Sequence, residues 1–172
     1  YSEILSMYCV AYEIKNNNPT LWFHASSLGE IKSVVPLISH FSKNKNYKIL
    51  ITTVTLSSSE YCRKIFEHTE NIIHQFAPLD TPIIVKKFLD HWKPQISIFV
   101  ESEIWPNLIL QTKKASKLIL LNARLSNKSF SRWKLAKKFA QKLFKQFDSI
   151  TAQSREVKSF LEFFGIQNVH FL

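Results

Sequence analysis

The sequence is short of glycine. Of its 172 residues only Gly29 and Gly165 are glycine. A Walker A loop or a G-x-G-x-x-G loop needs several glycines close together, so the chain contains neither of these phosphate-binding motifs. So little glycine also argues against a collagen-like chain, a linker-rich chain or an all-β fold with many tight turns.

Cysteine pairs, metal-ligand clusters and long apolar runs are also lacking. Cys9 and Cys62 are far apart with no C-x-x-C, which indicates two free thiols in a reducing compartment. The six histidines form no H-E-x-x-H or other close pair, so no metal site is predicted. No run of about 18 apolar residues is present, and we therefore expect no span of a bilayer. Because the chain opens with Tyr1 rather than Met, we expect it to be a fragment that has lost an upstream segment.

Acidic residues are absent from one long window. The formal net charge is +10, and residues 104–147 contain eleven lysines and arginines but no aspartate or glutamate. The rest of the chain is almost neutral, so the basicity is one contiguous feature, which favours an anionic partner. The richness in lysine, asparagine and isoleucine is also typical of an AT-rich genome, which raises lysine content without any function.

Short β-branched or aromatic runs alternate with longer segments of helical period. The pattern predicts strands at 21–25, 48–53, 72–77, 96–101, 117–122 and 149–153, and helices at 30–42, 58–67, 81–92, 106–114, 129–147 and 155–164. The runs 98–100 and 118–121 are continuously apolar, as in parallel strands covered on both faces. Six β-α units predict an α/β protein with a Rossmann-like, doubly wound parallel sheet.

Helix boundaries carry their own signals. We expect N-caps at Ser57 or Ser58, at Asp80 ahead of Pro82, and at Ser154. Gly165 stands just past the last predicted helix, where a left-handed residue is favoured.

Polar side chains follow the predicted strands at the ends where doubly wound sheets carry their working residues. Glu30 follows the first strand, and a helix N-terminus there would stabilise its carboxylate by about 0.3–1 kcal/mol. An ordinary helix-start glutamate is the commoner explanation of this position alone. The second strand ends in a hydroxyl-rich segment with Thr53 and Thr55, suited either to capping or to hydrogen bonds with a sugar or phosphate.

Two carboxylates, Glu101 and Glu103, follow the buried fourth strand directly before Trp105. Carboxylates close together in a partly desolvated site push their pKa values apart, which lets one of them hold or orient a proton. Two solvated loop acids are the alternative. Arg124 follows the fifth strand, where it can bind an anion or neutralise one of the two glutamates.

Taken together, these segments resemble the N-terminal domain of the Kdo (3-deoxy-D-manno-octulosonic acid) transferases, a family of inverting glycosyltransferases with the GT-B fold. The matching strings run in order over nearly the whole chain: H-A-S-S-L-G-E at 24–30, T-T-V-T at 52–55 with S-E at 59–60, P-L-D at 78–80, E-S-E-I-W-P-N at 101–107, N-A-R-L-S at 122–126, A-Q-S at 152–154 and F-F-G at 163–165. The pair E-x-E-x-W-P-N and N-A-R-L-S is highly specific. One departure is Leu56-Ser57-Ser58, where the family usually has Thr, Pro or Gly.

The resemblance implies roles that spacing does not show. Glu30 matches the family's proton acceptor, and Glu101 matches a residue regarded as stabilising the transition state. The residues implied for acceptor binding are Ser27, Gly29, Thr53, Thr55, Glu103, Asn107 and Arg124. The reaction implied is inverting transfer of Kdo from CMP-Kdo to a lipid A precursor, lipid IVA, in lipopolysaccharide biosynthesis. The resemblance implies no metal ion. It also implies no cofactor, since CMP-Kdo is a donor substrate.

The family's second domain, which carries the main CMP-Kdo site, has no counterpart in these 172 residues. Residues 1–172 are therefore expected to be the acceptor-binding half of a GT-B enzyme, inactive when isolated, with a separate chain as one source of the missing half. The implied location is the cytoplasmic face of the bacterial inner membrane, bound peripherally.

The stretch 128–147 has apolar residues at steps of three and four, which predicts one helix with one apolar face. Arg132, Lys134, Lys138 and Lys142 lie mostly off that face. A sheet-packing helix with solvated lysines is one interpretation, and a helix facing anionic lipid headgroups and lipid A phosphates is the other; both can hold together.

Two other functions compete with the enzymatic interpretation. One is a non-catalytic basic module that binds anionic lipid or nucleic acid. Because no nucleic-acid motif is present, we do not expect nucleic acid as a partner. The other is an inactive fragment of a decayed or split gene.

Overall fold

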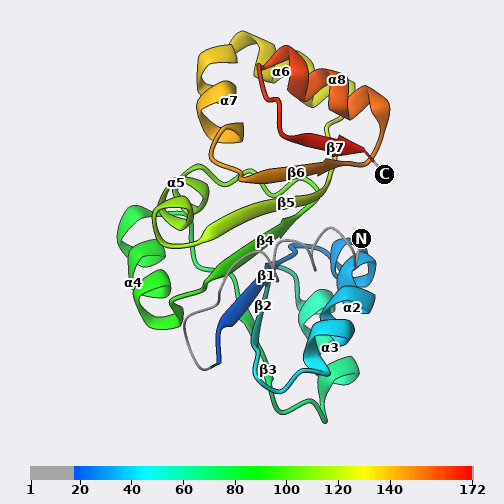
Figure 1. Ribbon diagram of the computed structural model, residues 1–172, viewed down its shortest axis with the longest axis vertical. Helices are drawn as coiled ribbons and strands as arrows, with labels where there is room; N and C mark the ends of the chain where they lie inside the picture. Colours follow the sequence, from blue (N-terminus) through cyan, green and yellow to red (C-terminus); the bar gives the residue numbers. More distant parts are fainter. Residues whose placement is uncertain (1–17, 172) are drawn as a thin grey trace.

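The computed structural model describes residues 18–171, which form one parallel sheet with helices on both faces (Figure 1). The strands are β1 Thr20–His24, β2 Lys48–Thr53, β3 Ile72–Phe76, β4 Ile96–Val100, β5 Lys117–Ala123, β6 Ser149–Ala152 and β7 Val169–Phe171. The helices are α2 Leu28–Ser42, α3 Leu56–Phe66, α4 Pro82–Trp92, α5 Pro106–Ala115, α6 Asn127–Leu135, α7 Lys137–Phe144 and α8 Arg155–Phe163.

The strand order is β3-β2-β1-β4-β5-β6-β7, with every neighbouring pair parallel. The chain builds outward from β1 to β3, crosses over through α4, and then builds outward in the other direction from β4. This confirms the predicted Rossmann-like doubly wound sheet. The strand order reverses between β1 and β4, so the loops after these two strands meet at the switch point where such sheets bind ligands.

Side chains of the central strands alternate between two apolar cores. On β1, Trp22 faces the core formed with α4, α5, α7 and α8, whereas Leu21 and Phe23 face the core formed with α2 and α3. All three side chains are fully buried. Because successive residues of a strand point to opposite faces, a continuously apolar strand must be covered on both sides, as the sequence indicated.

The single helix predicted at 129–147 is wrong. The chain leaves the helical conformation at Ala136, with φ −113° and ψ 39°, so α6 and α7 are separate helices. Phe130 of α6 stacks on Phe160 of α8, with ring centroids 3.9 Å apart, while Leu143 of α7 is buried against the sheet. The apolar residues of this stretch face two different neighbours, which one straight helix could not serve.

Two of the predicted helix starts are also wrong. The N-cap of α3 is Thr55, whose Oγ1 accepts a hydrogen bond from the Ser58 backbone N–H at 3.3 Å. Thr81, not Asp80, is the N-cap of α4. The predicted cap Ser154 is confirmed, since its Oγ accepts from the Val157 N–H at 3.2 Å.

Gly165 is left-handed with φ 74°, as predicted for the residue past the last helix. Strand β7 was not predicted. Cys62 is buried and has no disulfide, and Cys9 lies outside the described residues. Among helices in residues 18–171, none is long and apolar enough to cross a membrane.

Candidate active site

Glu30 lies in the first turn of α2, directly after the loop that leaves β1 at the carboxyl edge of the sheet. Ser27 is the N-cap of α2, and its Oγ accepts a hydrogen bond from the Glu30 backbone N–H at 3.3 Å. The Glu30 side chain reaches back, so that its Oε2 accepts from the Ser26 N–H at 2.7 Å. This exchange resembles a capping box and fixes the direction of the carboxylate, which stays half-buried.

The pKa of Glu30 lies above its ordinary value. Burial is the largest cause, and the negative charges of Glu103 and Glu101 raise the pKa further, whereas hydrogen bonds from Ser26 and Ser27 oppose the shift. A carboxyl group poised in this way is a better proton acceptor than an ordinary surface glutamate, because its basicity is matched more closely to neutral pH.

Glu103 lies beneath this loop and is only 6% exposed. Its Oε2 accepts hydrogen bonds from the Ser26 hydroxyl and, at 2.5 Å, from the Trp105 indole N–H. His24 Nε2 lies 2.9 Å from the same oxygen. Burial alone would raise the pKa of Glu103, but hydrogen bonds from His24, Ser26 and Trp105 and the charge interaction with His24 outweigh burial and hold the pKa below its ordinary value.

Glu101 and Arg124 lie at the ends of the neighbouring strands β4 and β5. Arg124 Nη1 is 3.8 Å from Glu101 Oε2, and the Arg124 side chain is mostly exposed. Glu101 has a left-handed backbone with φ 57°, which non-glycine residues rarely adopt. Such conformations cluster at functional sites, where the surrounding structure holds them in place.

The carboxyl edge therefore gathers three glutamates and one arginine around the switch point of the sheet. Residues 3–172 match the N-terminal region of the 3-deoxy-D-manno-octulosonic-acid transferases (kdotransferases). This chain belongs to the Kdo transferase family.

Individual relatives agree with this assignment. The chain is 40% identical over 149 residues to the 3-deoxy-D-manno-octulosonic acid transferase of Rickettsia typhi, covering 86% of this chain and 32% of the relative. It is 32% identical over 135 residues to the enzyme of the same name from Haemophilus influenzae, covering 77% of this chain and 31% of the relative. The chain thus spans about a third of the length of these curated relatives.

A solved structure supports the fold alone. A protein of Listeria monocytogenes described as a UDP-N-acetylglucosamine 2-epimerase superposes with a TM-score of 0.61 at 13% identity. The superposition covers 88% of this chain and 44% of the other.

Most residues expected to bind the acceptor in this Kdo transferase domain also make contacts inside the protein. Thr53 is buried and its Oγ1 lies 2.9 Å from His74 Nε2. The Asn107 side-chain amide donates to the Asp80 backbone carbonyl at 2.8 Å. Ser27 and Thr55 cap helices, whereas Gly29 is exposed beside Glu30.

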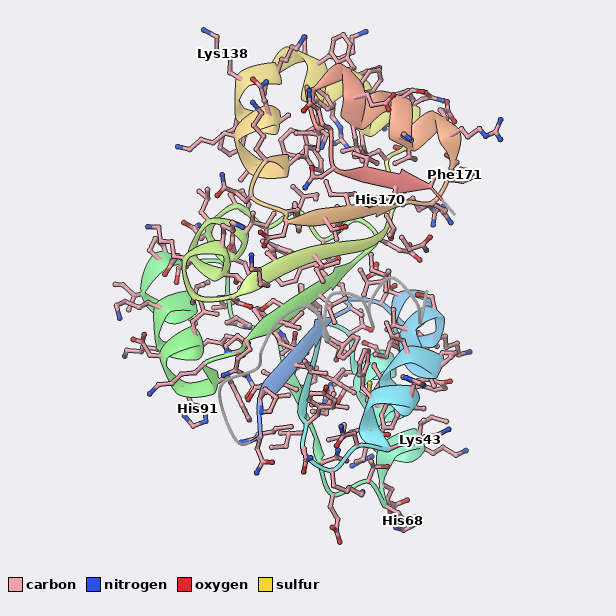
Figure 2. All side chains as sticks on the ribbon, viewed as in Figure 1. Lys43, His68, His91, Lys138, His170 and Phe171 are labelled. Carbon is pink, nitrogen blue, oxygen red and sulfur yellow. The ribbon has the colours of Figure 1, made fainter. Side chains whose placement is uncertain are left out.

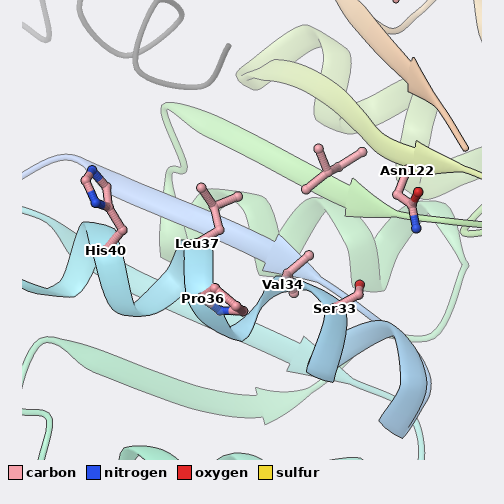
Figure 3. Close-up of a pocket in the computed structure, with 7 residues that line it drawn as sticks. Ser33, Val34, Pro36, Leu37, His40 and Asn122 are labelled. Atoms are coloured by element: carbon pink, nitrogen blue, oxygen red, sulfur yellow. The ribbon is translucent and has the colours of Figure 1, made fainter. Parts of the chain in front are cut away.

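A pocket of about 430 Å³ runs along α2 beside the site. Its walls include Ser33, Val34 and Leu37, which follow Glu30 on the same face of the helix at steps of three, four and seven. Asn122, at the end of β5, lines the same pocket, and in Figure 3 it lies toward the arrowheads of the strands. Apolar and polar walls are therefore available close to the half-buried carboxylate.

The basic residues predicted to contact a membrane are exposed. We define the basic surface as Arg132 and Lys134 of α6 with Lys138 and Lys142 of α7. Leu135, at the turn between these helices, is 92% exposed. Lys134 also lies over the Phe130 and Phe163 rings, at 5.4 and 5.9 Å from their centroids, so part of its role is structural.

Three residues of the site were not singled out from the sequence: His24, Ser26 and Trp105. His24 could have been found from the sequence, because it lies near the end of one predicted strand and Thr52 lies near the end of the next. The two residues are directly opposite each other in the parallel register of β1 and β2. A polar pair in register at the carboxyl ends of two central strands points to the site.

Proposed function

We propose that this chain forms the acceptor-binding half of an enzyme that transfers Kdo from CMP-Kdo to a hydroxyl of a lipid A precursor, lipid IVA, in lipopolysaccharide biosynthesis. Membership of the Kdo transferase family and the length of the chain relative to its curated relatives support this division of labour. The observation that carries the proposal is Glu30, a half-buried carboxyl group with raised pKa at the switch point of a doubly wound sheet.

In this proposal Glu30 is the general base. The acceptor oxygen attacks the anomeric carbon of Kdo as its proton passes to the Glu30 carboxylate. The bond between the anomeric carbon and the phosphate oxygen of CMP breaks, and CMP leaves with the electron pair. A single displacement of this kind inverts the anomeric centre. The hydrogen bond from the Ser26 N–H holds the Glu30 carboxylate in one direction, which favours this geometry.

Glu101 and Arg124 supply the remaining charges of the edge. Positive charge develops on the sugar in the transition state of glycosyl transfer, and a fixed carboxylate such as Glu101 stabilises it. Arg124 is mostly exposed and presents a guanidinium group suited to a phosphate of the acceptor. The pocket along α2 lies on the Glu30 side of the helix, where part of the acceptor can rest.

The basic surface gives the proposed enzyme a means of docking. Each lysine or arginine near an anionic bilayer contributes about 1 kcal/mol, so four of them favour a peripheral position on such a membrane. The corresponding proposal is attachment at the cytoplasmic face of the inner membrane, where the exposed Leu135 would also meet the lipid.

Glu30→Gln in the full-length product of the gene tests the chemistry. We expect the native protein to transfer Kdo from CMP-Kdo to lipid IVA in mixed vesicles. The Glu30→Gln variant should lose at least about a hundredfold in kcat. Glu156→Gln is the matched control, because Glu156 also lies in the first turn of a helix but outside the site. A native protein without transfer activity, or a Glu30→Gln variant as active as the control, would overturn the proposal.

A further inference from the structure

A buried series of polar contacts lies close to the loop between β1 and α2, just before Glu30. The Trp22 indole N–H donates to Thr52 Oγ1 at 2.8 Å, and Thr52 Oγ1 lies 2.9 Å from His24 Nδ1. His24 Nε2 lies 2.9 Å from Glu103 Oε2 and, apart from this contact, has no hydrogen-bond partner within the described residues. Trp22, Thr52 and His24 are almost completely buried.

Both ring nitrogens of His24 have a polar neighbour in this series. Because Trp22 uses only one lone pair of Thr52 Oγ1, the Thr52 hydroxyl can either donate its proton to His24 Nδ1 or accept one from it. In either case Nε2 is the ring nitrogen that faces Glu103, so a proton on Nε2 lies next to the carboxylate. The series therefore connects the core to the Glu103 carboxylate.

Ser26 joins this buried carboxylate to the candidate base. Its hydroxyl donates to Glu103 Oε2, and its backbone N–H donates to Glu30 Oε2 at 2.7 Å. One residue thus links two carboxylates that come from β1–α2 and β4–α5, on the two sides of the switch point.

We propose that Glu103 is a positioning residue, held ionised by His24, Ser26 and Trp105, that fixes the Ser26 loop and places a permanent negative charge beside Glu30. It would act through Glu30 and not by touching the acceptor, because only 6% of its surface is exposed. This role replaces the acceptor contact expected for Glu103 from the sequence, and as a part of catalysis it rests on the proposed function.

The electrostatics of the edge agree with this geometry. Glu103 and Glu101 are the charged neighbours that raise the pKa of Glu30, after burial. Arg124 stands beside Glu101, and His24 stands beside Glu103. Removing the Glu103 charge should therefore lower the pKa of Glu30, whereas removing its donors should let the pKa of Glu103 rise.

The first test uses residues 1–172 and needs no activity. Carbon-13 NMR titration of the glutamate carboxyl groups, assigned through Glu30→Gln and Glu103→Gln, gives the midpoints of both residues. In Glu103→Gln the Glu30 midpoint should shift to lower pH, whereas Glu162→Gln, on the exposed Lys158 pair of α8, should leave it unchanged. An unchanged Glu30 midpoint in Glu103→Gln would refute the electrostatic coupling.

A second variant covers the case in which Glu103→Gln fails to fold. Thr52→Val keeps the shape of the side chain but removes the hydroxyl that orients His24. The Glu103 midpoint should then move to higher pH. A Glu103 midpoint that stays in place would show that the series from Trp22 does not hold this carboxylate.

Kinetics of the full-length product separate positioning from acceptor contact. Glu103→Gln should lower kcat by up to about a hundredfold with little change in the KM for the acceptor, and should shift the acid limb of the pH profile to lower pH. A raised acceptor KM with unchanged kcat and pH profile would instead show direct binding and overturn the proposal. If the full-length product transfers no Kdo, the NMR midpoints still decide the coupling, so the two failures are distinguishable.

Discussion

The Arg124 guanidinium lies 3.8 Å from the Glu101 carboxylate, across the ends of two neighbouring strands. The sequence left open whether Arg124 binds an anion or neutralises a glutamate. The distance shows that it stands beside Glu101, and the exposure of its side chain, 65%, leaves most of its donors available to a ligand. A pair at this distance with a mostly exposed arginine contributes about 0–1 kcal/mol to stability, so the pairing alone gives little reason to hold an arginine here.

Arg124→Ala should therefore affect binding more than folding. We expect the free energy of unfolding to change by less than about 1 kcal/mol, because the Arg124 side chain is mostly exposed. The KM for lipid IVA should rise while kcat changes less. Glu101→Gln should do the reverse and lower kcat, since a charge that acts in the transition state does not hold the acceptor. Steady-state kinetics and urea denaturation of both variants measure this, and equal effects on KM would contradict the division of roles.

Glu30→Gln should stabilise the fold at neutral pH. Because the folded-state pKa of Glu30 is raised, the folded protein binds this proton more tightly than the unfolded chain, and ionisation of Glu30 costs stability as pH rises from about 4.5 through the folded pKa. Glutamine carries no such charge and still offers an oxygen to the Ser26 N–H.

Urea denaturation at pH 7 and pH 4 checks this sign. Glu30→Gln should exceed the native chain in stability at pH 7, and the difference should shrink at pH 4, where the native carboxyl group is mostly protonated in both states. The Glu156→Gln control should show no such pattern. A native chain that is the more stable one at pH 7 would indicate that Glu30 serves chiefly to cap α2, the commoner explanation of its position in the sequence.

The sheet was predictable because its strands carry a strong signal. The buried runs of β4 and β5 are apolar without alternation, and a doubly wound sheet is the arrangement that covers such strands on both faces. The break at Ala136 was not predictable, because Leu135, Ala136 and Lys137 all favour helix and neither glycine nor proline marks the position. The packing of Phe130 on α8 is a tertiary contact, and it overrides local propensity.

The same division applies to the site. The rule that ligands bind beyond the carboxyl ends of strands places Glu30, Glu101 and Arg124 at one edge. It does not show that Glu103 turns inward, because that depends on a left-handed Glu101, and glutamate gives no signal for this conformation. Two carboxylates separated by one residue consequently meet different surroundings, one beside an exposed arginine and one beside a buried histidine.

Asp80 should contribute more to the free energy of unfolding than Asp90, an exposed aspartate of α4. Asp80 Oδ1 accepts a hydrogen bond from the Leu108 N–H at 2.7 Å, and Asp80 Oδ2 accepts one from the Asn107 N–H at 3.3 Å. Asp80 therefore supplies acceptors to the free backbone N–H groups in the first turn of α5, although it lies in a different loop. Asp80→Ala should cost about 1–2 kcal/mol, the usual value of a helix cap. Asp90→Ala, which removes only an exposed pair with Lys86, should cost less than about 1 kcal/mol. If urea denaturation gave the same loss of stability for Asp80→Ala and Asp90→Ala, the hydrogen bonds between Asp80 and α5 would contribute nothing extra.

The basic surface should bind anionic bilayers through charge. Lys138 and Lys142 lie four residues apart on α7, so both meet a bilayer that approaches this helix. Replacing both by glutamine should weaken binding of residues 1–172 to phosphatidylglycerol vesicles about thirtyfold, at about 1 kcal/mol for each lysine.

The matched control replaces Lys43 and Lys45 by glutamine, which removes the same charge at a distant place. Figure 2 shows Lys43 and Lys138 toward opposite ends of the molecule, so a site-specific contact should spare the control.

Added salt should weaken the native binding, because exposed charges are screened within about 10 Å at 0.1 M ionic strength. Equal losses in the two double variants would indicate a diffuse effect of the net charge. Tighter binding to duplex DNA than to the vesicles would instead favour a nucleic-acid module, and the lipid-facing role of α7 would be wrong.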